Sequence, residues 1–290
     1  MNSLSNKTIL VTGSSGFVGS KLVSRLIHDG VNVICLPRNQ ELKCDDKIDI
    51  LFHLGAFTPK TPKMANSIDD IYRSNIMATH SLLQSLPNIP ERIVFSSTLD
   101  VYAISDNDAT TEMSKVDPPS LYGSSKLFCE KLITTFAMQN NCKYSILRYG
   151  NIYGPGEAAY AKLIPQTIRA ILSNISPNIH GNPNALRDFV YIDDVIEATI
   201  RSVTHVTDSI EPLNIVSGTS YSVEFFVRKI IEIFNSTISI NYTDQDILGI
   251  SRSFNNSRML DLLGKWNQIA INDGLQKEIE YFKLIGGYDE

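Results

Sequence analysis

Residues 8–19 of the 290-residue chain read TILVTGSSGFVG, and this stretch decides the fold. Its first five residues are apolar or β-branched, which favours a buried strand. Gly13 permits a tight turn, Gly16 lets the backbone approach a pyrophosphate, and Gly19 lets the following helix lie close to the strand. Because N–H groups at the start of such a helix bind phosphate, the stretch predicts the first βα unit of a dinucleotide-binding sheet.

Short apolar runs and helical patterns alternate through the first half of the chain. The runs predict buried strands at Thr8–Thr12, Val31–Leu36, Ile50–Leu54, Ile93–Ser97 and Tyr144–Arg148. Helices are expected at Gly16–Asp29, Ser67–Leu86 and Pro119–Asn140. This alternation implies right-handed βαβ crossovers and a parallel sheet. The segment between Leu36 and Asp49 is too short for a helix and a strand, so we expect the sheet's third βα unit to be trimmed.

The second half of the chain predicts further helices separated by short extended pieces. These helices are expected at Lys162–Leu172, Asp193–Val203, Val223–Phe234 and Ile271–Phe282. The predicted fold class is α/β: a Rossmann-type doubly wound parallel sheet with a smaller C-terminal α/β substrate-binding lobe. We expect residues 1–160 to form the dinucleotide-binding domain, with a returning segment near 185–215, and residues 161–290 to form mainly the lobe.

The composition narrows the function classes. With 43% hydrophobic and 20% charged residues the chain is typical of a globular protein, and its net charge of -5 argues against a nucleic-acid partner. The sequence shows no signal peptide and no apolar stretch of membrane-spanning length, so a cytoplasmic protein without membrane contact is expected. Four cysteines without a CxxC pair and five scattered histidines predict no metal site.

The end of the second predicted strand bears on the choice of dinucleotide. An acidic side chain there would bind the adenosine ribose and repel a 2′-phosphate. The sequence instead has Cys35-Leu36-Pro37-Arg38, in which Arg38 can pair with a 2′-phosphate. This favours NADP, while NAD stays possible and Arg38 as a solvated loop residue is the alternative.

Tyr122 and Lys126 lie four residues apart at the start of a predicted helix. Residues at this spacing share one helix face. A lysine ammonium near the hydroxyl favours the phenolate, so we expect Lys126 to lower the pKa of Tyr122.

Polar side chains also follow the fourth predicted strand, at Ser96-Ser97-Thr98. Because ligands bind at the carboxyl ends of parallel strands, Thr98 is placed to donate a hydrogen bond to a substrate oxygen while Tyr122 transfers the proton. A plain strand-end turn is the alternative for this run.

Together the glycine loop, Thr98, Tyr122 and Lys126 resemble the extended short-chain dehydrogenase/reductase family, in its NAD-dependent epimerase/dehydratase branch. The resemblance covers most of the chain and includes HLGA at 53–56, RYGNIYGPG at 148–156 and RDFVYIDDV at 187–195. It implies that Tyr122 is the acid/base, that Lys126 also holds the nicotinamide ribose and that Thr98 orients the reacting oxygen.

The same resemblance implies which residues contact the ligands and how the chain assembles. The implied cofactor contacts are Gly13, Ser15, Gly16, Phe17, Val18, Arg38, Leu54, Ala56, Asn75, Ser96, Tyr122, Lys126 and Tyr149. Thr98, Asn151, Arg187 and Arg252 are the implied contacts to a nucleotide-diphosphate sugar, and arginine suits phosphate because its planar fork binds two oxygens at once. A homodimer through the helices that carry Asn75 and Tyr122 is implied as well.

The residues before Tyr102 bear on the reaction. Dehydratases of this branch use an acid at the position of Asp100, and some carry a second acid at the position of Leu99. Asp100 is a possible auxiliary acid/base, but leucine cannot donate a proton. Dehydration by two acids is therefore not expected. Because NADP suits an enzyme that releases its cofactor oxidised after reducing a ketone, and because the chain is short like 4-ketoreductases, we expect NADP-dependent reduction of a nucleotide-linked 4-keto-6-deoxyhexose at C4. The alternatives are a nucleotide-sugar C4 epimerase with bound NAD, a nucleotide-sugar 4,6-dehydratase and a non-catalytic dinucleotide-sensing regulator.

Overall fold

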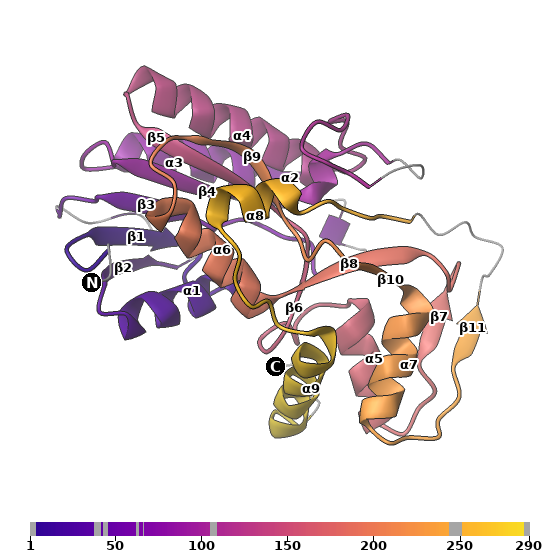
Figure 1. The fold of residues 1–290 in the computed structure, drawn as a ribbon. Coiled ribbons are helices and arrows are strands. Elements are labelled where there is room, and N and C mark those ends of the chain that lie inside the picture. Colours follow the sequence, from indigo (N-terminus) through magenta and orange to yellow (C-terminus); the bar gives the residue numbers. More distant parts are fainter. Residues whose placement is uncertain are drawn as a thin grey trace.

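A six-stranded parallel sheet forms the centre of the molecule (Figure 1). The computed structural model describes residues 4–37, 42, 46–61, 64–65, 67–104, 109–243 and 251–286. The sheet consists of β1 (Thr8–Thr12), β2 (Asn32–Leu36), β3 (Ile50–His53), β4 (Arg92–Thr98), β5 (Lys143–Tyr149) and β9 (Ile210–Ile215). Its strand order is β2-β1-β3-β4-β5-β9, which confirms the Rossmann-type fold. The described residues between β2 and β3 form neither helix nor strand, in agreement with a trimmed third βα unit.

Helices cover both faces of this sheet because the strand residues alternate in direction (Figure 1). On one face lie α1 (Phe17–His28) and α6 (Ile192–Thr204), and on the other lie α3 (Ala78–Ser85) and α4 (Leu121–Gln139). Ile9 and Val11 of β1 belong to the same core as Leu22 of α1. Leu10, between them in sequence, belongs to the second core with Ile133 of α4.

The single helix predicted at Ser67–Leu86 is divided into three segments. They are α2 (Ile68–Ile71), the π-helical segment η2 (Tyr72–Met77) and α3. The Thr79 hydroxyl donates to the Asn75 carbonyl oxygen at 2.6 Å, inside this stretch. Since π-helical turns are rare and often accompany functional sites, the position of Asn75 within η2 directs attention to it.

The C-terminal half adds small sheets and further helices (Figure 1). Its elements are β6 (Asn151–Tyr153), α5 (Leu163–Leu172), β7 (Asn178–His180), β8 (Leu186–Tyr191), β10 (Ser220–Ser222), α7 (Val223–Ile233), β11 (Asn241–Thr243), α8 (Ser257–Leu263) and α9 (Ile271–Leu284). Strands β10, β8 and β6 form one sheet, and β11 pairs with β7. Arg187 lies in β8, where Tyr221 of β10 is its partner. Within the described part of the chain, no helix has the length and apolarity needed to cross a bilayer.

Candidate active site

The carboxyl ends of four neighbouring strands meet at one edge of the central sheet. In the register of the sheet Thr12 pairs with His53, His53 with Phe95, and Thr98 with Tyr149. The glycine loop after β1, the segment 54–56 after β3 and the loop after β4 therefore lie side by side. Because β1 is flanked by β2 and β3, the glycine loop sits where the strand order reverses, which is where dinucleotides bind in such sheets.

The glycine loop is packed as a dinucleotide site requires. A Cβ atom added at Gly19 would lie 2.1 Å from the Gly13 carbonyl oxygen, and one added at Gly13 would lie 2.7 Å from the Gly55 Cα. Among the described residues, no side chain caps the first turn of α1, whose N-cap is the exposed Gly16. The backbone N–H groups of this first turn can therefore bind a pyrophosphate. The residues present thus fit a dinucleotide.

Two features at the start of α4 place Tyr122. The Ser120 hydroxyl caps the helix by accepting the Gly123 N–H at 3.0 Å. A Cβ atom added at Gly123 would lie 2.2 Å from the Asp100 carbonyl oxygen. Only glycine allows this close approach, and it holds Tyr122 beside the Thr98–Asp100 loop. Thr98 caps the short 3-10 helix η3 (Leu99–Val101) by accepting the Asp100 N–H at 3.2 Å.

The expected effect of Lys126 on Tyr122 is not what the structure shows. Burial raises the pKa of Tyr122 above its ordinary value of 10, with a hydrogen bond to Thr58 acting against the rise and Asp100 and Tyr160 adding to it. The prediction of a lowered pKa is wrong for this arrangement because desolvation of the phenolate outweighs any lysine effect.

Lys126 is buried one helix turn after Tyr122, and its Nζ lies 4.2 Å from the centre of the Phe95 ring. Burial lowers the pKa of Lys126 to about 8, while Cys129 and Glu130 act in the opposite direction. The ammonium group is therefore held close to its titration range at neutral pH. Small changes in the surrounding charges decide how much of it is protonated.

A chain of hydrogen bonds runs from β1 through β3 to η2. His53 is bonded through Nδ1 to the Thr12 hydroxyl at 2.7 Å and through Nε2 to the Thr79 hydroxyl at 2.8 Å. Since Thr79 donates to the Asn75 carbonyl, it accepts from His53, which places the imidazole proton on Nε2. Burial, together with the charge of Lys126, lowers the pKa of His53 to about 3, so the ring is neutral.

Asn75 connects two segments of the candidate site through both ends of its amide. Its Oδ1 accepts the Phe57 N–H at 2.6 Å, and its Nδ2 donates to the Phe57 carbonyl at 3.2 Å and to the Ser125 hydroxyl at 3.0 Å. Ser125 donates in turn to the Tyr122 carbonyl at 2.8 Å. Asn75 thus links the segment that carries Thr58 to the helix turn that carries Tyr122. Thr58, which directly follows the HLGA motif and Phe57, was not predicted as a site residue.

The implied substrate contacts converge on the start of β8. Asn151 donates to the Asp188 carbonyl at 3.2 Å, and the Arg252 N–H donates to the Leu186 carbonyl at 3.0 Å. Burial lowers the pKa of Arg187, and the charge of Arg252 lowers it further, so the two guanidinium groups lie within each other's field. Arg252 also donates to Asp100 at 3.0 Å, which joins this group to the loop after Thr98.

Asp188, which the sequence analysis did not single out, fixes the turn after β9. Its Oδ1 accepts the Ser217 N–H and hydroxyl at 3.0 and 2.8 Å, and its Oδ2 accepts the Gly218 N–H at 2.9 Å. The side chain is fully buried, and burial raises its pKa to about 6. Asp188 therefore holds the strand of Arg187 against the end of the central sheet.

The remaining implied cofactor contacts are placed differently from one another. Ser15, Phe17 and Val18 belong to the loop and helix after β1, and Leu54 and Ala56 follow the end of β3. Ser96 donates to the His53 carbonyl at 3.4 Å. The hydroxyl of Tyr149 is hydrogen-bonded to Thr199 of α6 at 2.8 Å, and the side chain belongs to the hydrophobic core. Arg38 lies outside the described residues.

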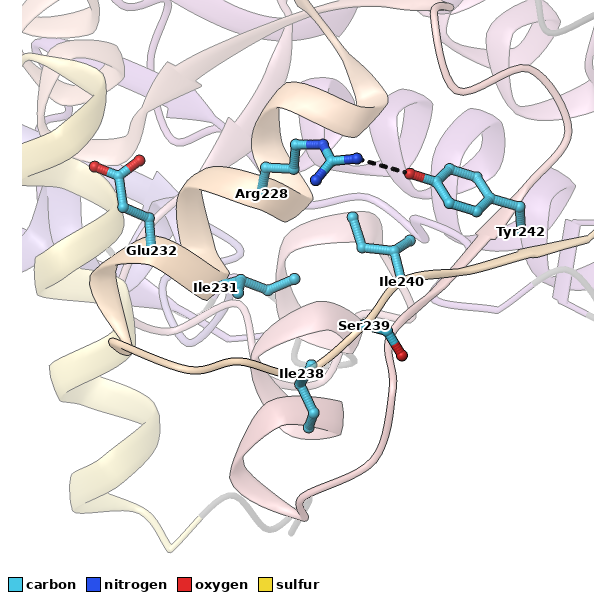
Figure 2. A pocket seen from close by; sticks show the side chains of 7 residues that line it. All are labelled: Arg228, Ile231, Glu232, Ile238, Ser239, Ile240 and Tyr242. Atoms are coloured by element: carbon cyan, nitrogen blue, oxygen red, sulfur yellow. Dashed lines mark hydrogen bonds between the residues drawn. The ribbon is translucent and has the colours of Figure 1, made fainter.

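A cavity of about 370 Å³ lies away from these residues, between α7 and the segment that leads to β11 (Figure 2). Figure 2 shows Arg228 directed at Tyr242, with Ile231, Ile238 and Ile240 below them. Arg228 is already paired with Glu224. None of the implied catalytic residues lines this cavity, so the edge of the central sheet remains the candidate active site. In the described ranges no three His, Cys, Asp or Glu side chains gather as a metal site.

Curated relatives cover most of the chain. It is 27% identical over 272 residues to a UDP-N-acetyl-alpha-D-glucosaminuronate decarboxylase of Bacillus cytotoxicus, covering 81% of this chain and 82% of the relative. It is 26% identical over 318 residues to the dTDP-D-glucose 4,6-dehydratase of Bos taurus, covering 96% of this chain and 89% of the relative.

Solved structures give the same picture. MoeE5 in complex with UDP-glucose and NAD superposes with a TM-score of 0.85 at 27% identity, covering 96% of this chain and 99% of that chain. The UDP-glucose 4-epimerase of Thermotoga maritima with UDP-glucose gives 0.84 at 25% identity, covering 96% and 99%. The family model for the NAD dependent epimerase/dehydratase family matches residues 9–216. This chain, an oxidoreductase-type enzyme built around a nicotinamide cofactor, therefore belongs to the NAD dependent epimerase/dehydratase family.

Proposed function

We propose that this enzyme inverts the C4 configuration of a UDP-linked sugar with bound NAD. The observation that carries the proposal is the composition of the loop after β4. Tyr122 and Thr98 can serve the interconversion of one alcohol and its ketone. A buried Leu99 occupies the position at which some dehydratases have a second acid. Relatives and solved structures that act on or bind UDP sugars support the substrate class.

Leu99 argues against dehydration by two acids. Its side chain is 4% exposed and packs with Val101, Tyr102, Val216 and Phe254, so no proton donor reaches the site from this position. Asp100, the other candidate, is paired with Arg252. An elimination needs both a base and an acid, whereas epimerisation through a ketone needs a single group that takes and returns one proton.

Tyr122 would take the proton of the C4 hydroxyl while Thr98 holds the same oxygen. A bound nicotinamide would supply the acceptor for the C4 hydride and the donor that restores it, so no net oxidation would result. The 4-keto sugar would then turn so that the opposite face of C4 meets the hydride donor, and Tyr122 would return its proton to the oxygen. Lys126 supplies a positive charge to this region, which favours the transient phenolate.

Arg187 and Arg252, with Asn151, would hold the diphosphate of the sugar nucleotide. The Arg252 guanidinium donates to Asp100 in the loop after Thr98, and its charge acts on Arg187. A guanidinium fork matches phosphate oxygens, and burial of Arg187 strengthens such a contact. On this proposal residues 1–160 and the segment near 185–215 hold the cofactor, and the remaining residues hold mainly the sugar nucleotide.

Reduction of a 4-keto-6-deoxyhexose with NADPH is the second candidate, and the NADP preference indicated by Arg38 favours it. One experiment separates the two. Purified enzyme without added cofactor is incubated with UDP-glucose or UDP-galactose, and the products are resolved by chromatography. Interconversion supports the epimerase. If neither sugar changes but NADPH is consumed with a 4-keto sugar nucleotide, the reductase is correct; formation of a 4-keto-6-deoxy product would establish dehydration.

A further inference from the structure

An ion pair lies buried directly behind the candidate active site. The Glu130 carboxylate of α4 accepts from Arg148 of β5 through Nε at 2.9 Å and through Nη2 at 2.8 Å. It also accepts the Ser97 hydroxyl of β4 at 2.5 Å. The side chains of Glu130 and Arg148 are only 5% and 4% exposed. A bidentate pair with a third donor fixes the geometry more tightly than a single contact does.

Each partner of this pair is adjacent to a residue of the proposed reaction. Glu130 follows Lys126 by one helix turn and Tyr122 by two, so the three share one face of α4. Ser97 directly precedes Thr98, and it pairs with Arg148 in the register of β4 and β5. The pair thus connects the helix of the acid/base to the strand end that carries Thr98.

A second layer holds the arginine in place. The Arg148 guanidinium lies 4.8 Å from the centre of the Tyr102 ring. The Tyr102 hydroxyl donates to Asn214 of β9 at 2.7 Å. Tyr102 ends the loop that begins at Thr98, so the same guanidinium supports the loop from both of its ends.

Packing of α4 against the sheet does not require a charged pair at Glu130 and Arg148. The next turns of the same helix face, at Ile133 and Ala137, lie against the sheet through apolar side chains. Burying two charges costs several kcal/mol in desolvation, and an apolar pair of equal volume is often as stable. The charged pair therefore has a use other than stability.

We propose that Glu130 is a positioning residue for the proposed reaction: through Arg148 and Ser97 it holds Thr98, Tyr122 and Lys126 in one arrangement. This inference rests on the proposed function. Glu130 does not touch the reacting atoms and acts through these neighbours.

The negative charge of Glu130 adds an electrostatic contribution. The groups that face Lys126 are His53 of β3, which is neutral, the Phe95 ring of β4, and Cys129 and Glu130 of its own helix. Burial lowers the pKa of Lys126, and Glu130 is one of the groups that raise it again. Without this carboxylate Lys126 loses its proton at a lower pH.

The test compares two variants with the wild-type enzyme. Glu130→Gln/Arg148→Met removes both charges together, because removing one alone would leave an unpaired buried charge and endanger folding. Ile133→Ala is the matched control: it loosens the same helix by making a cavity and touches none of the polar contacts. Thermal midpoint, kcat and KM for UDP-glucose are measured for each, with kcat followed from mildly acidic to alkaline pH.

For the double variant we expect kcat to fall roughly tenfold or more, with KM within about twofold. The fall of kcat on the alkaline side of its pH profile, here called the alkaline limb, should move to lower pH by about half a unit. Ile133→Ala should lower the thermal midpoint but leave kcat and the limb in place. The proposal would be overturned if the double variant kept the kcat and the alkaline limb of the wild type. It would also be overturned if kcat fell in both variants in proportion to the loss of thermal midpoint.

A failure of the proposed function is recognised separately. If the wild-type enzyme converts neither UDP-glucose nor UDP-galactose, the affinity for NADH decides about Glu130, since Lys126 is expected to hold the nicotinamide ribose. The double variant should then bind NADH about threefold more weakly at alkaline pH, the largest effect of a half-unit shift, and Ile133→Ala should bind it like the wild type. Equal dissociation constants in all three proteins would overturn the role of Glu130.

Discussion

Replacing Glu278 with glutamine should stabilise the protein, and the gain should grow with pH. Glu278 of α9 is fully buried, and neither of its carboxyl oxygens has a hydrogen-bond partner among the described residues. Burial raises its pKa from an ordinary 4.5 to about 9; Glu157 adds to the rise, while Lys162 and Lys21 oppose it. Glu157 is itself buried, and its pKa is raised to about 7.

The raised pKa costs stability as pH rises. Below about pH 4.5 Glu278 is protonated in both the folded and the unfolded chain, and its contribution is fully present. Between about 4.5 and 9 the unfolded chain ionises while the folded chain keeps the proton, so the free energy of unfolding falls. At about pH 8 the gap of about 3.5 pH units corresponds to ~5 kcal/mol at most. Because Glu157 and the lysines share this field, we expect about 2–5 kcal/mol.

Glutamine keeps the shape of the side chain and cannot ionise, so Glu278→Gln removes this loss. At roughly 2–4 °C per kcal/mol, the thermal midpoint should rise by about 4–20 °C at about pH 8 and hardly at all near pH 5. Circular dichroism melts across this range measure it. Glu280→Gln, an exposed position on the same helix, is the matched control and should show no such trend. An equal gain at both pH values, or the same trend in the control, would refute the argument.

Three further predictions concern ligands. Thr98→Val should lower kcat by about 10²-fold or more with a smaller change in KM, measured by steady-state kinetics, because the lost hydroxyl serves the reacting oxygen; an effect confined to KM would contradict this. Arg187→Met should raise the KM for UDP-glucose roughly 10-fold to 100-fold, whereas Arg228→Met in α7 should leave it unchanged; similar effects of both would remove the diphosphate assignment. Arg38→Ala should weaken NADPH much more than NADH in a binding titration if Arg38 meets a 2′-phosphate, and equal effects would end that interpretation.

Most of the central sheet could be predicted because its strands carry a strong local signal. The runs around Val11, Val94 and Ile146 are buried on both faces, and each predicted strand lies within one residue of its observed bounds at either end. The three-residue strands β6, β7, β10 and β11 have no such signal, since their pairing depends on partners far away in sequence.

The interrupted helix around Asn75 could not be predicted from periodicity. A π-helical segment changes the helical register by contacts that a sequence pattern does not contain, here the bonds of Asn75 to Phe57 and Ser125. The apolar positions on either side still fit an ordinary helix, so the pattern predicts a continuous one.

The candidate site shows the same division. The four-residue spacing of Tyr122 and Lys126 is local, and so the sequence displays it. The pKa of Tyr122 instead depends first on burial and then on Thr58, Asp100 and Tyr160, which other segments supply. Glu130 continues the spacing by one more turn, but only the fold shows that Arg148 and Ser97 meet it. Residue types and spacing thus identify candidates, and tertiary contacts decide their protonation.

The most direct test of the account follows the nicotinamide absorbance after UDP-glucose is mixed with the purified enzyme and no cofactor is added. Wild-type enzyme should contain bound NAD, and the reduced band should appear with substrate alone and then persist at a steady fraction. Tyr122→Phe, with the same amount of NAD bound, should form the band about 10²-fold to 10⁴-fold more slowly. A wild-type enzyme that carries NAD but never forms the band, or a Tyr122→Phe variant that forms it at the wild-type rate, would contradict the account.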